Sequence, residues 1–367
     1  MTHLDAAAMR DELHRIPELG FEEVKTSEYV AKKLEELGIE TRRGVGGTGV
    51  LGVIKGSEPG PVLLMRADMD ALPFKNPDGS IERVHACGHD GHTAMLLAAA
   101  GDLVGKIRRG TLKLLFQPAE ETLKGALAVI DDGVIDDVDI ALGLHVRPVQ
   151  DIPAGTMCAA VHHVSSVFLE ATVKGVASHA SRPHLGVNAA EAAALVTLAV
   201  AAVKLNPNMK WSCKVTGIDA MSSAPNIIPD AARIVLDARA QTNDLMDEMI
   251  SKVEAAVKGA AAAVGAQGEV HTLGRVIPAA DYDEELVNEV RESIIKTVGA
   301  DKLAPDCGAG GEDFHFFKRH KPSIKAAYFG VGAGCAPGLH ARDMHFESHW
   351  LENGVKVLVD MALKKLG

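Results

Sequence analysis

Residues 84–100, VHACGHDGHTAMLLAAA, place an unusual number of metal-binding side-chain types next to one another. Cys87 and His89 are separated by a glycine that lets the backbone turn, and an apolar, alanine-rich segment typical of a helix follows. Thiolate and imidazole groups are ligands that zinc and similar divalent ions prefer. Cys87 alone would fit a small buried apolar residue, but its spacing from His89 favours a metal-binding pair.

Further candidate ligands follow three strand-like runs of the sequence. They are Asp68 and Asp70 after VLLMR, Glu120 and Glu121 after LKLLFQPA, and His145 after IALGL. The carboxyl ends of strands in an open α/β sheet meet at one edge, so we expect these side chains to converge on one crevice. One tetrahedral ion could not use all of these donors, and the sequence therefore predicts a site for two metal ions.

The adjacent Glu120 and Glu121 have two interpretations. They would suit the first turn of a helix, where the helix dipole favours negative charge. Two carboxylates directly after an apolar strand are costly if they are buried without a partner, however, and a metal ion would supply one. Hydrolysis at a metal site needs one carboxylate to bind the ion and another to take a proton from water. We therefore predict Glu121 as a ligand and Glu120 as the general base.

The elements that would carry these residues alternate between strands and helices. Apolar positions have helical spacing over residues 5–37 and end at Gly38. The strand-like runs GVLGVIKG, PVLLMRAD, TLKLLFQPAEE and VDIALGLHV then alternate with helical stretches at 92–104 and 122–132. This order is typical of a mainly parallel α/β sheet.

The pattern changes near Ser165, as expected for a chain of 367 residues, a length that favours two domains. Strands at 166–174, 211–218, 231–239 and 269–274 and helices at 187–204 and 244–264 give a β-α-β-β-α-β order. That order suits a four-stranded antiparallel sheet with two helices on one face. We predict a catalytic α/β domain made of residues 1–164 and 276–367, interrupted by an inserted domain of residues 165–275.

Composition and charge exclude several classes of partner. The formal net charge is −11 and no long basic cluster is present, so we expect neither nucleic-acid nor membrane partners. No apolar run approaches the roughly 20 residues that a membrane span needs, and the first residues lack a secretory apolar segment. We therefore expect a cytoplasmic protein. The five cysteines are widely spaced, which argues against a disulfide framework.

Two glycine-rich runs could suggest nucleotide binding. GVGGTG at 44–49 is followed by a strand-like run rather than a helix, so it fails as a dinucleotide-binding motif. GAGGED at 308–313 lacks the Lys-Ser/Thr pair of a phosphate-binding loop. We interpret this second run as a tight loop against a site.

Five ordered motifs resemble a known enzyme family: RADMDALP, HACGHDGHTAMLL, FQPAEE, GLHV and GLHARDMHF. They are similar to the signature of the di-metal amidohydrolases and metallopeptidases that include hippurate hydrolase, N-acyl-amino-acid hydrolases and auxin-conjugate hydrolases. The resemblance spans nearly the whole chain and implies a catalytic domain interrupted by a lid domain that also forms the dimer. Position by position, it implies these metal ligands: Cys87, His89, Glu121, His145 and His340.

The resemblance also implies roles outside the ligand set. It makes Glu120 the general base and Asp70 the residue that orients the site. In the lid, His179 would stabilise the oxyanion in the partner subunit, although a surface histidine at a sheet edge is the alternative. Asn226 and Arg239 would bind the substrate, with a solvated strand arginine as the alternative for the second of them.

Together with these residues, the resemblance implies hydrolysis of the amide bond of an N-acyl or N-aroyl amino acid by water held between two divalent ions. Zinc or manganese is the expected metal, with cobalt and nickel as further candidates. The resemblance implies a homodimer paired through the lid. The alternatives are a dipeptidase or carboxypeptidase acting on small peptides, an amidohydrolase of carbamoyl compounds, and an inert, metal-stabilised binding protein. Because the other motifs complete the ligand set, Asp90 and His92 are expected to support the site or cap the helix.

Overall fold

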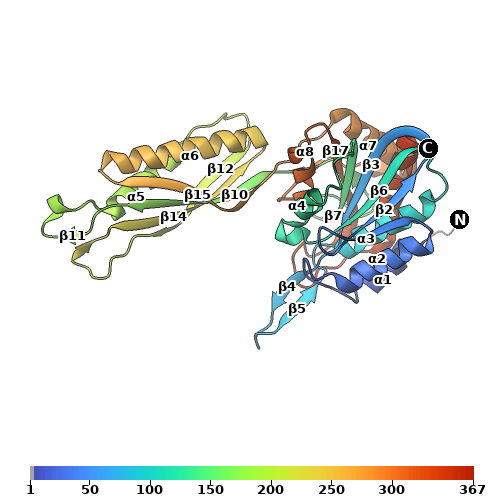
Figure 1. Ribbon diagram of the computed structural model, residues 1–367, viewed down its shortest axis with the longest axis horizontal. Helices are drawn as coiled ribbons and strands as arrows, with labels where there is room; N and C mark the ends of the chain where they lie inside the picture. Colours follow the sequence, from blue (N-terminus) through green and yellow to red (C-terminus); the bar gives the residue numbers. More distant parts are fainter. Residues whose placement is uncertain (1–3) are drawn as a thin grey trace. The chain divides into compact units, whose positions relative to one another are not determined.

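The computed structural model describes residues 4–367 and divides them into two compact units. One unit combines the chain up to His162 with Asp281–Gly367, and the other is His163–Ala280. The larger unit contains a seven-stranded sheet with the order β1-β2-β6-β3-β7-β17-β8 (Figure 1). Its strands are β1 (Glu40–Val45), β2 (Gly49–Lys55), β3 (Glu58–Asp68), β6 (Arg109–Gln117), β7 (Ile140–Pro148), β8 (Met157–Cys158) and β17 (Lys325–Cys335).

The four central strands of this sheet, β6, β3, β7 and β17, run parallel to one another, whereas β1, β2 and β8 join antiparallel. Every residue of β7 except Pro148 is buried, as expected for a strand covered on both faces. The larger helices of the unit are α1 (Ala6–Leu13), α2 (Val24–Glu36), α3 (His89–Leu103), α4 (Gly125–Asp131), α7 (Glu284–Thr297), α8 (Phe316–His320) and α9 (Leu351–Leu366).

Helix α3 positions the metal-binding pair predicted from the sequence, because it begins at His89, two residues after Cys87. It packs against α1, α9 and β3, and all of its residues except Asp102 are buried. This all-round burial explains why the segment is rich in alanine and leucine rather than amphipathic.

The helical spacing over residues 5–37 corresponds to two helices in the structure, α1 and α2. The chain folds back between them so that the Glu18 carboxylate accepts hydrogen bonds from the backbone N–H groups of Lys25 and Thr26, at 2.8 and 2.9 Å. These N–H groups lie in the first turn of α2 and would otherwise lack partners. Glu18 therefore caps the start of α2.

Shorter elements of the larger unit connect the sheet to the site. A hairpin is formed by β4 (Leu72–Lys75) and β5 (Ile81–Val84), and β9 (Val161–His163) pairs with β16 (Cys307–Ala309). The single helical turns are η1 (Glu120–Thr122), η3 (Ala300–Lys302), η4 (Asp313–His315) and η5 (Ser348–Trp350).

The second unit has the β-α-β-β-α-β order that the sequence predicts. Its antiparallel sheet has the order β12-β14-β10-β15. The elements are β10 (Ser165–Lys174), α5 (Ala189–Ala201), β12 (Trp211–Asp219), β14 (Ala231–Ala240), α6 (Asn243–Ala263) and β15 (Gln267–Ile277), with the short pair β11 (Ser178–His179) and β13 (Ile227–Ile228) and the turn η2 (Pro183–Leu185). Helices α5 and α6 cover one face of the sheet (Figure 1), where alternate strand residues such as Leu169 and Leu236 are fully buried. Over residues 4–367, no helix has both the length and the apolar character that crossing a bilayer requires.

Candidate active site

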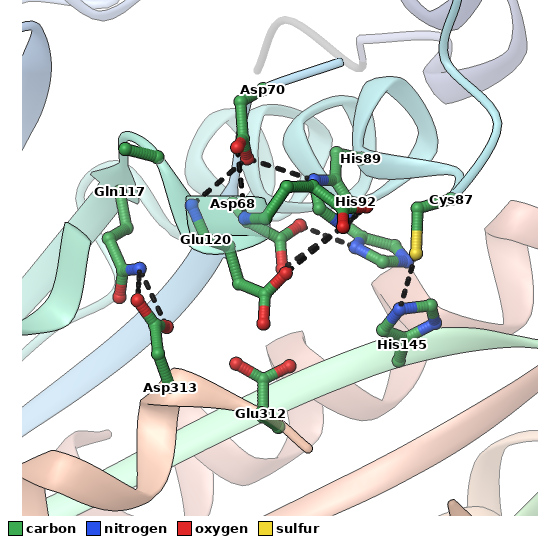
Figure 2. Close-up of polar contacts among 12 residues, drawn as sticks. Asp68, Asp70, Cys87, His89, His92, Gln117, Glu120, His145, Glu312 and Asp313 are labelled. Carbon is green, nitrogen blue, oxygen red and sulfur yellow. Dashed lines mark hydrogen bonds and ion pairs between the residues drawn. The ribbon is translucent and has the colours of Figure 1, made fainter. Parts of the chain in front are cut away.

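The carboxyl ends of the parallel strands bring the strand-end residues together, as the sequence predicts. Asp68 is the last residue of β3, Glu120 follows β6 by three residues, and His145 lies in β7. Figure 2 shows these side chains pointing toward Cys87 and His89, which lie at the start of α3. Side chains from four elements therefore meet at one edge of the sheet.

The turn between Cys87 and His89 depends on glycine. Gly88 has φ of +88°, and a Cβ atom there would lie 2.4 Å from Cγ2 of Val146. Both the conformation and the space exclude a larger residue. Beyond this turn, Sγ of Cys87 lies 3.4 Å from Nε2 of His145. Nδ1 of His145 donates to the carbonyl of Val146, which leaves a lone pair on Nε2 for a ligand.

Asp70 holds the two glutamates and one histidine in place. Its Oδ1 accepts from the backbone N–H of Glu120 at 3.2 Å, and its Oδ2 accepts from that of Glu121 at 3.0 Å. Nδ1 of His89 lies 3.1 Å from Oδ1 of Asp70, so the ring donates from that nitrogen and turns Nε2 into the site. The preceding Ala119 has φ of +54°, and its N–H donates to the buried Glu23 carboxylate at 2.8 Å.

Two buried polar atoms face each other in the site without a hydrogen-bond partner. They are Nε2 of His89 and Oε1 of Glu121, which lie 3.9 Å apart. An unpaired buried nitrogen and carboxylate oxygen are costly, and a cation between them would satisfy both. This pair of orphaned atoms fits a metal ion.

His340 reaches the same place from a loop late in the chain. Its backbone N–H donates to the carbonyl of Ala86 at 2.7 Å, and its Nε2 lies 3.5 Å from Oε1 of Glu121. The residue has φ of +64°, in the left-handed region that few residues other than glycine adopt. The loop conformation therefore directs the imidazole toward the carboxylate.

The ligand atoms form two overlapping sets, each within 4.8 Å. One set is Cys87, His89 and His145, and the other is Cys87, Glu121 and His340. Because both sets share the thiol of Cys87, the donors suit two divalent ions that lie close together. The structure thus brings together all five residues that the family resemblance implied as ligands.

His92 and Asp90 have other partners. Nδ1 of His92 lies 2.6 Å from Oδ1 of Asp68, and its Nε2 accepts from the N–H of Val146 at 2.9 Å, so both ring nitrogens are engaged. Asp90 lies 2.7 Å from Nδ1 of His14 and 2.9 Å from Nε of Arg10. Neither residue has a free group for an ion.

A buried ionic network behind Glu120 was not identified from the sequence. Arg66 lies 2.7 Å from Asp68, 3.0 Å from Glu312 and 2.7 Å from Asp313, and all four side chains are buried. Figure 2 shows Glu312 facing Glu120, and these carboxylates form a close group with Asp313. The only sequence feature that pointed to this network was the GAGGED run, which contains Glu312 and Asp313 and which we interpreted as a loop against a site.

The network sets the charge around the general base candidate. Burial raises the pKa of Glu120 well above its usual range, and the carboxylates of Glu312 and Asp313 raise it further. A carboxyl group with a raised pKa can both accept and return a proton near neutral pH. Burial and the neighbouring His92 hold the pKa of His145 well below its usual range, which keeps the ring neutral, as a ligand must be.

The predicted substrate-binding residues belong to the second unit. His179 lies in β11, Nδ1 of its ring accepts from the N–H of Ser181 at 3.1 Å, and the next residue, Ala180, donates to the carbonyl of Asn226 at 2.9 Å. Arg239 in β14 pairs with Asp237 through Nε and Nη2, at 2.7 and 3.1 Å. His179 and Asn226 are therefore neighbours, whereas the fork of Arg239 already binds a carboxylate.

Comparison with known proteins identifies the family. A model of peptidase family M20/M25/M40 matches residues 64–364. The chain belongs to this family. Hippurate hydrolase of Campylobacter jejuni is 33% identical over 379 residues, which cover 98% of this chain and 96% of the relative. Indole-3-acetyl-aspartic acid hydrolase of Enterobacter agglomerans is 28% identical over 415 residues, with 96% and 94% covered.

A solved structure agrees with this membership. The YXEP protein of Bacillus subtilis, a dinuclear metal binding peptidase of the M20 family, has a TM-score of 0.83 at 27% identity, covering 98% of this chain and 97% of that one. The resemblance and the two-domain α/β fold predicted from the sequence are therefore confirmed, and this M20 family member is a metal-dependent amidohydrolase or peptidase.

Proposed function

We propose that this M20 family member hydrolyses the amide bond of N-acyl or N-aroyl amino acids. The observation that carries the proposal is the position of the Glu120 carboxylate, whose Oε2 lies 4.0 Å from Nε2 of His89 at the edge of the two ligand sets. The acyl-amino-acid substrates named for the hippurate and indole-3-acetyl-aspartic acid hydrolases support this substrate class.

The residues assigned to the metal ions are Cys87, His89, Glu121, His145 and His340. Divalent ions, when bound there, polarise a carbonyl group and acidify water. Zinc or manganese suits the mixed donors best, and cobalt and nickel are further candidates. Asp70 fixes the orientation of His89 and of the glutamate turn.

Glu120 performs the proton transfers in the proposed reaction. Its carboxylate takes a proton from the attacking water, and the resulting carboxyl group returns that proton to the nitrogen of the leaving amine. The buried Glu312 and Asp313 favour the protonated form of Glu120, which makes its carboxylate a stronger base for the first transfer.

The second unit supplies the remaining roles as a lid. We propose that residues 165–275 form the lid and dimerisation domain, and that residues 1–164 and 276–367 form the catalytic domain. His179 stabilises the oxyanion in the partner subunit of a homodimer. Asn226 and Arg239 bind the carboxylate of the amino acid, and Arg239 exchanges its contact with Asp237 for this substrate group.

The second candidate function is a peptidase acting on dipeptides or other small peptides. The similarity to the YXEP protein, which is described as a peptidase, favours this candidate. A carbamoyl amidohydrolase would use the same site.

A substrate panel separates these functions. Metal-free protein is loaded in turn with zinc, manganese, cobalt and nickel, and N-acetyl, N-benzoyl, N-carbamoyl and dipeptide substrates are assayed side by side. We expect the highest kcat/KM with an N-acyl or N-benzoyl amino acid. A preference for dipeptides would replace the proposal with the peptidase function, and a loaded protein inert to every N-acyl and N-benzoyl amino acid would contradict the proposal.

A further inference from the structure

His340 is the most exposed of the five assigned ligands. Its side chain is 58% exposed, compared with 11% for that of Glu121 and none for that of His89. It stands on a loop whose ends are joined by two hydrogen bonds between Ala336 and His345, at 3.0 and 2.9 Å. This exposure means that the surrounding protein packs little around the imidazole, so the loop itself must hold it.

Arg342, two residues beyond His340, fastens this loop to the β4–β5 hairpin. Its Nη1 donates to Oδ1 of Asn76 at 2.8 Å, and its Nη2 donates to the carbonyl of Lys75 at 3.0 Å. Nη1 also lies 3.3 Å from Oε2 of Glu82. The guanidinium carbon is 5.4 Å from the centre of the Phe74 ring. A planar guanidinium group can make all of these contacts at once, which an ammonium group cannot.

The hairpin is itself part of the framework of the site. It begins directly after Asp70 and Ala71, and it leads through His85 and Ala86 to Cys87. Its base is anchored because the N–H of Ala71 donates to the carbonyl of Glu18 at 2.7 Å. Arg342 therefore ties the last ligand in the chain to the segment that connects Asp70 with the first ligand.

We propose that Arg342 is a positioning residue that holds His340 in its ligand orientation and so sets the affinity of the metal position shared by Cys87, Glu121 and His340. The inference rests on the proposed metal-dependent function and extends it. The contacts of Arg342 order the His340 loop before the ion binds. The free energy of ion binding therefore does not have to offset the entropy lost on ordering that loop. Without the contacts of Arg342, the exposed imidazole samples other orientations, and the ion loses one of its ligands for part of the time.

The test compares R342A with a matched control, R83A. Arg83 lies on the same hairpin and is 44% exposed, compared with 43% for Arg342, but it pairs with Glu22 at 2.7 Å rather than with the His340 loop. Metal-free wild type and both variants are titrated with zinc alone by calorimetry, and their melting temperatures are measured without metal. R342K, which retains the charge but not the planar fork, serves as a second variant if R342A gives too little folded protein.

We expect wild type and R83A to bind two zinc ions tightly, whereas R342A binds one tightly and the other about 10- to 100-fold more weakly. The metal-free melting temperature should be the same in all three proteins. Two tight ions in R342A would overturn the role of Arg342 and leave the proposed function intact. A lower metal-free melting temperature in R342A that accompanies its weaker zinc binding would also overturn the role of Arg342, because it would indicate a merely structural contact. A wild type that binds no zinc, manganese, cobalt or nickel would overturn the proposed function itself.

Discussion

The Asp70 carboxylate lies 3.1 Å from Nδ1 of His89 while it also accepts the backbone N–H groups of Glu120 and Glu121. One side chain thus orients His89 and the backbone of both glutamates, which are the proposed general base and two of the proposed ligands. These contacts give Asp70, two residues after the end of β3, a role in the site that does not require its side chain to contact an ion.

Replacing Asp70 by asparagine should therefore weaken metal binding about 10- to 100-fold. An amide has one acceptor oxygen, so at least one of the three donors loses its partner. Zinc titration of the metal-free D70N protein measures the effect. D78N, in the turn of the β4–β5 hairpin where Asp78 accepts from Ser80, is the control and should bind zinc like wild type. Unchanged affinity in D70N would contradict the orienting role.

Replacing Glu120 by glutamine should lower kcat at least about 100-fold, because general base catalysis typically contributes that much or more. The metal content should stay at the wild-type level, since Glu120 is not an assigned ligand. Steady-state kinetics with an N-acyl amino acid and metal analysis of the same sample give both numbers. Near-normal turnover would rule out the base assignment.

A mixture of E120Q and H179A tests the proposal that His179 of one subunit acts in the active site of its partner. Each variant alone should be inactive, but a mixed dimer retains one site with an intact Glu120 and an intact His179 from the partner. Random exchange of subunits makes half of the dimers mixed, with one working site each, so about a quarter of wild-type activity should return. If no activity returns on mixing, or if wild type is fully active as a monomer, His179 does not act across a dimer.

Arg66 should contribute strongly to stability because its removal leaves the buried Glu312 and Asp313 carboxylates without their cation and takes one partner from Asp68. We expect R66M to lower the free energy of unfolding by about 3–5 kcal/mol or more. Arg43 also pairs with two carboxylates, those of Glu28 and Glu35, but at the surface, and R43M should change stability little. Urea unfolding of the three proteins makes the comparison, and equal stabilities of R66M and R43M would show that the buried network is not needed.

Glu23 should make the stability of the protein fall as pH rises toward neutrality. Burial raises the pKa of Glu23 from its ordinary value of 4.5 to about 7, against the hydrogen bonds from Thr48 and Ala119. Between these values the unfolded chain has lost a proton that the folded chain retains, so folding is favoured less as pH rises. E23Q should lack this slope and gain up to about 3 kcal/mol at pH 8 relative to wild type. Urea unfolding from pH 4 to pH 8 tests it, and parallel curves for the two proteins would contradict the prediction.

The sequence predicted those parts of the site that follow from local pattern. Glu120 and His145 could be placed because parallel strands deliver their carboxyl ends to one edge, and Cys87 because its spacing from His89 is short. Arg66 could not be paired with Asp313, since the two are 247 positions apart and no periodicity connects them. His340 was found only through the family motif, because its position depends on a loop with a positive φ rather than on a strand end.

The order of the strands in the larger unit has a consequence for how the protein is made. β17 lies between β7 and β8 in the sheet, yet it is translated after the whole of His163–Ala280. The second unit is continuous in sequence, so it can close its own sheet while the growing chain is still on the ribosome. The sheet of the larger unit cannot close until Cys335 has been synthesised. Domain insertion therefore allows the inserted unit to fold first, whereas the site cannot be assembled until the last part of the chain has been synthesised.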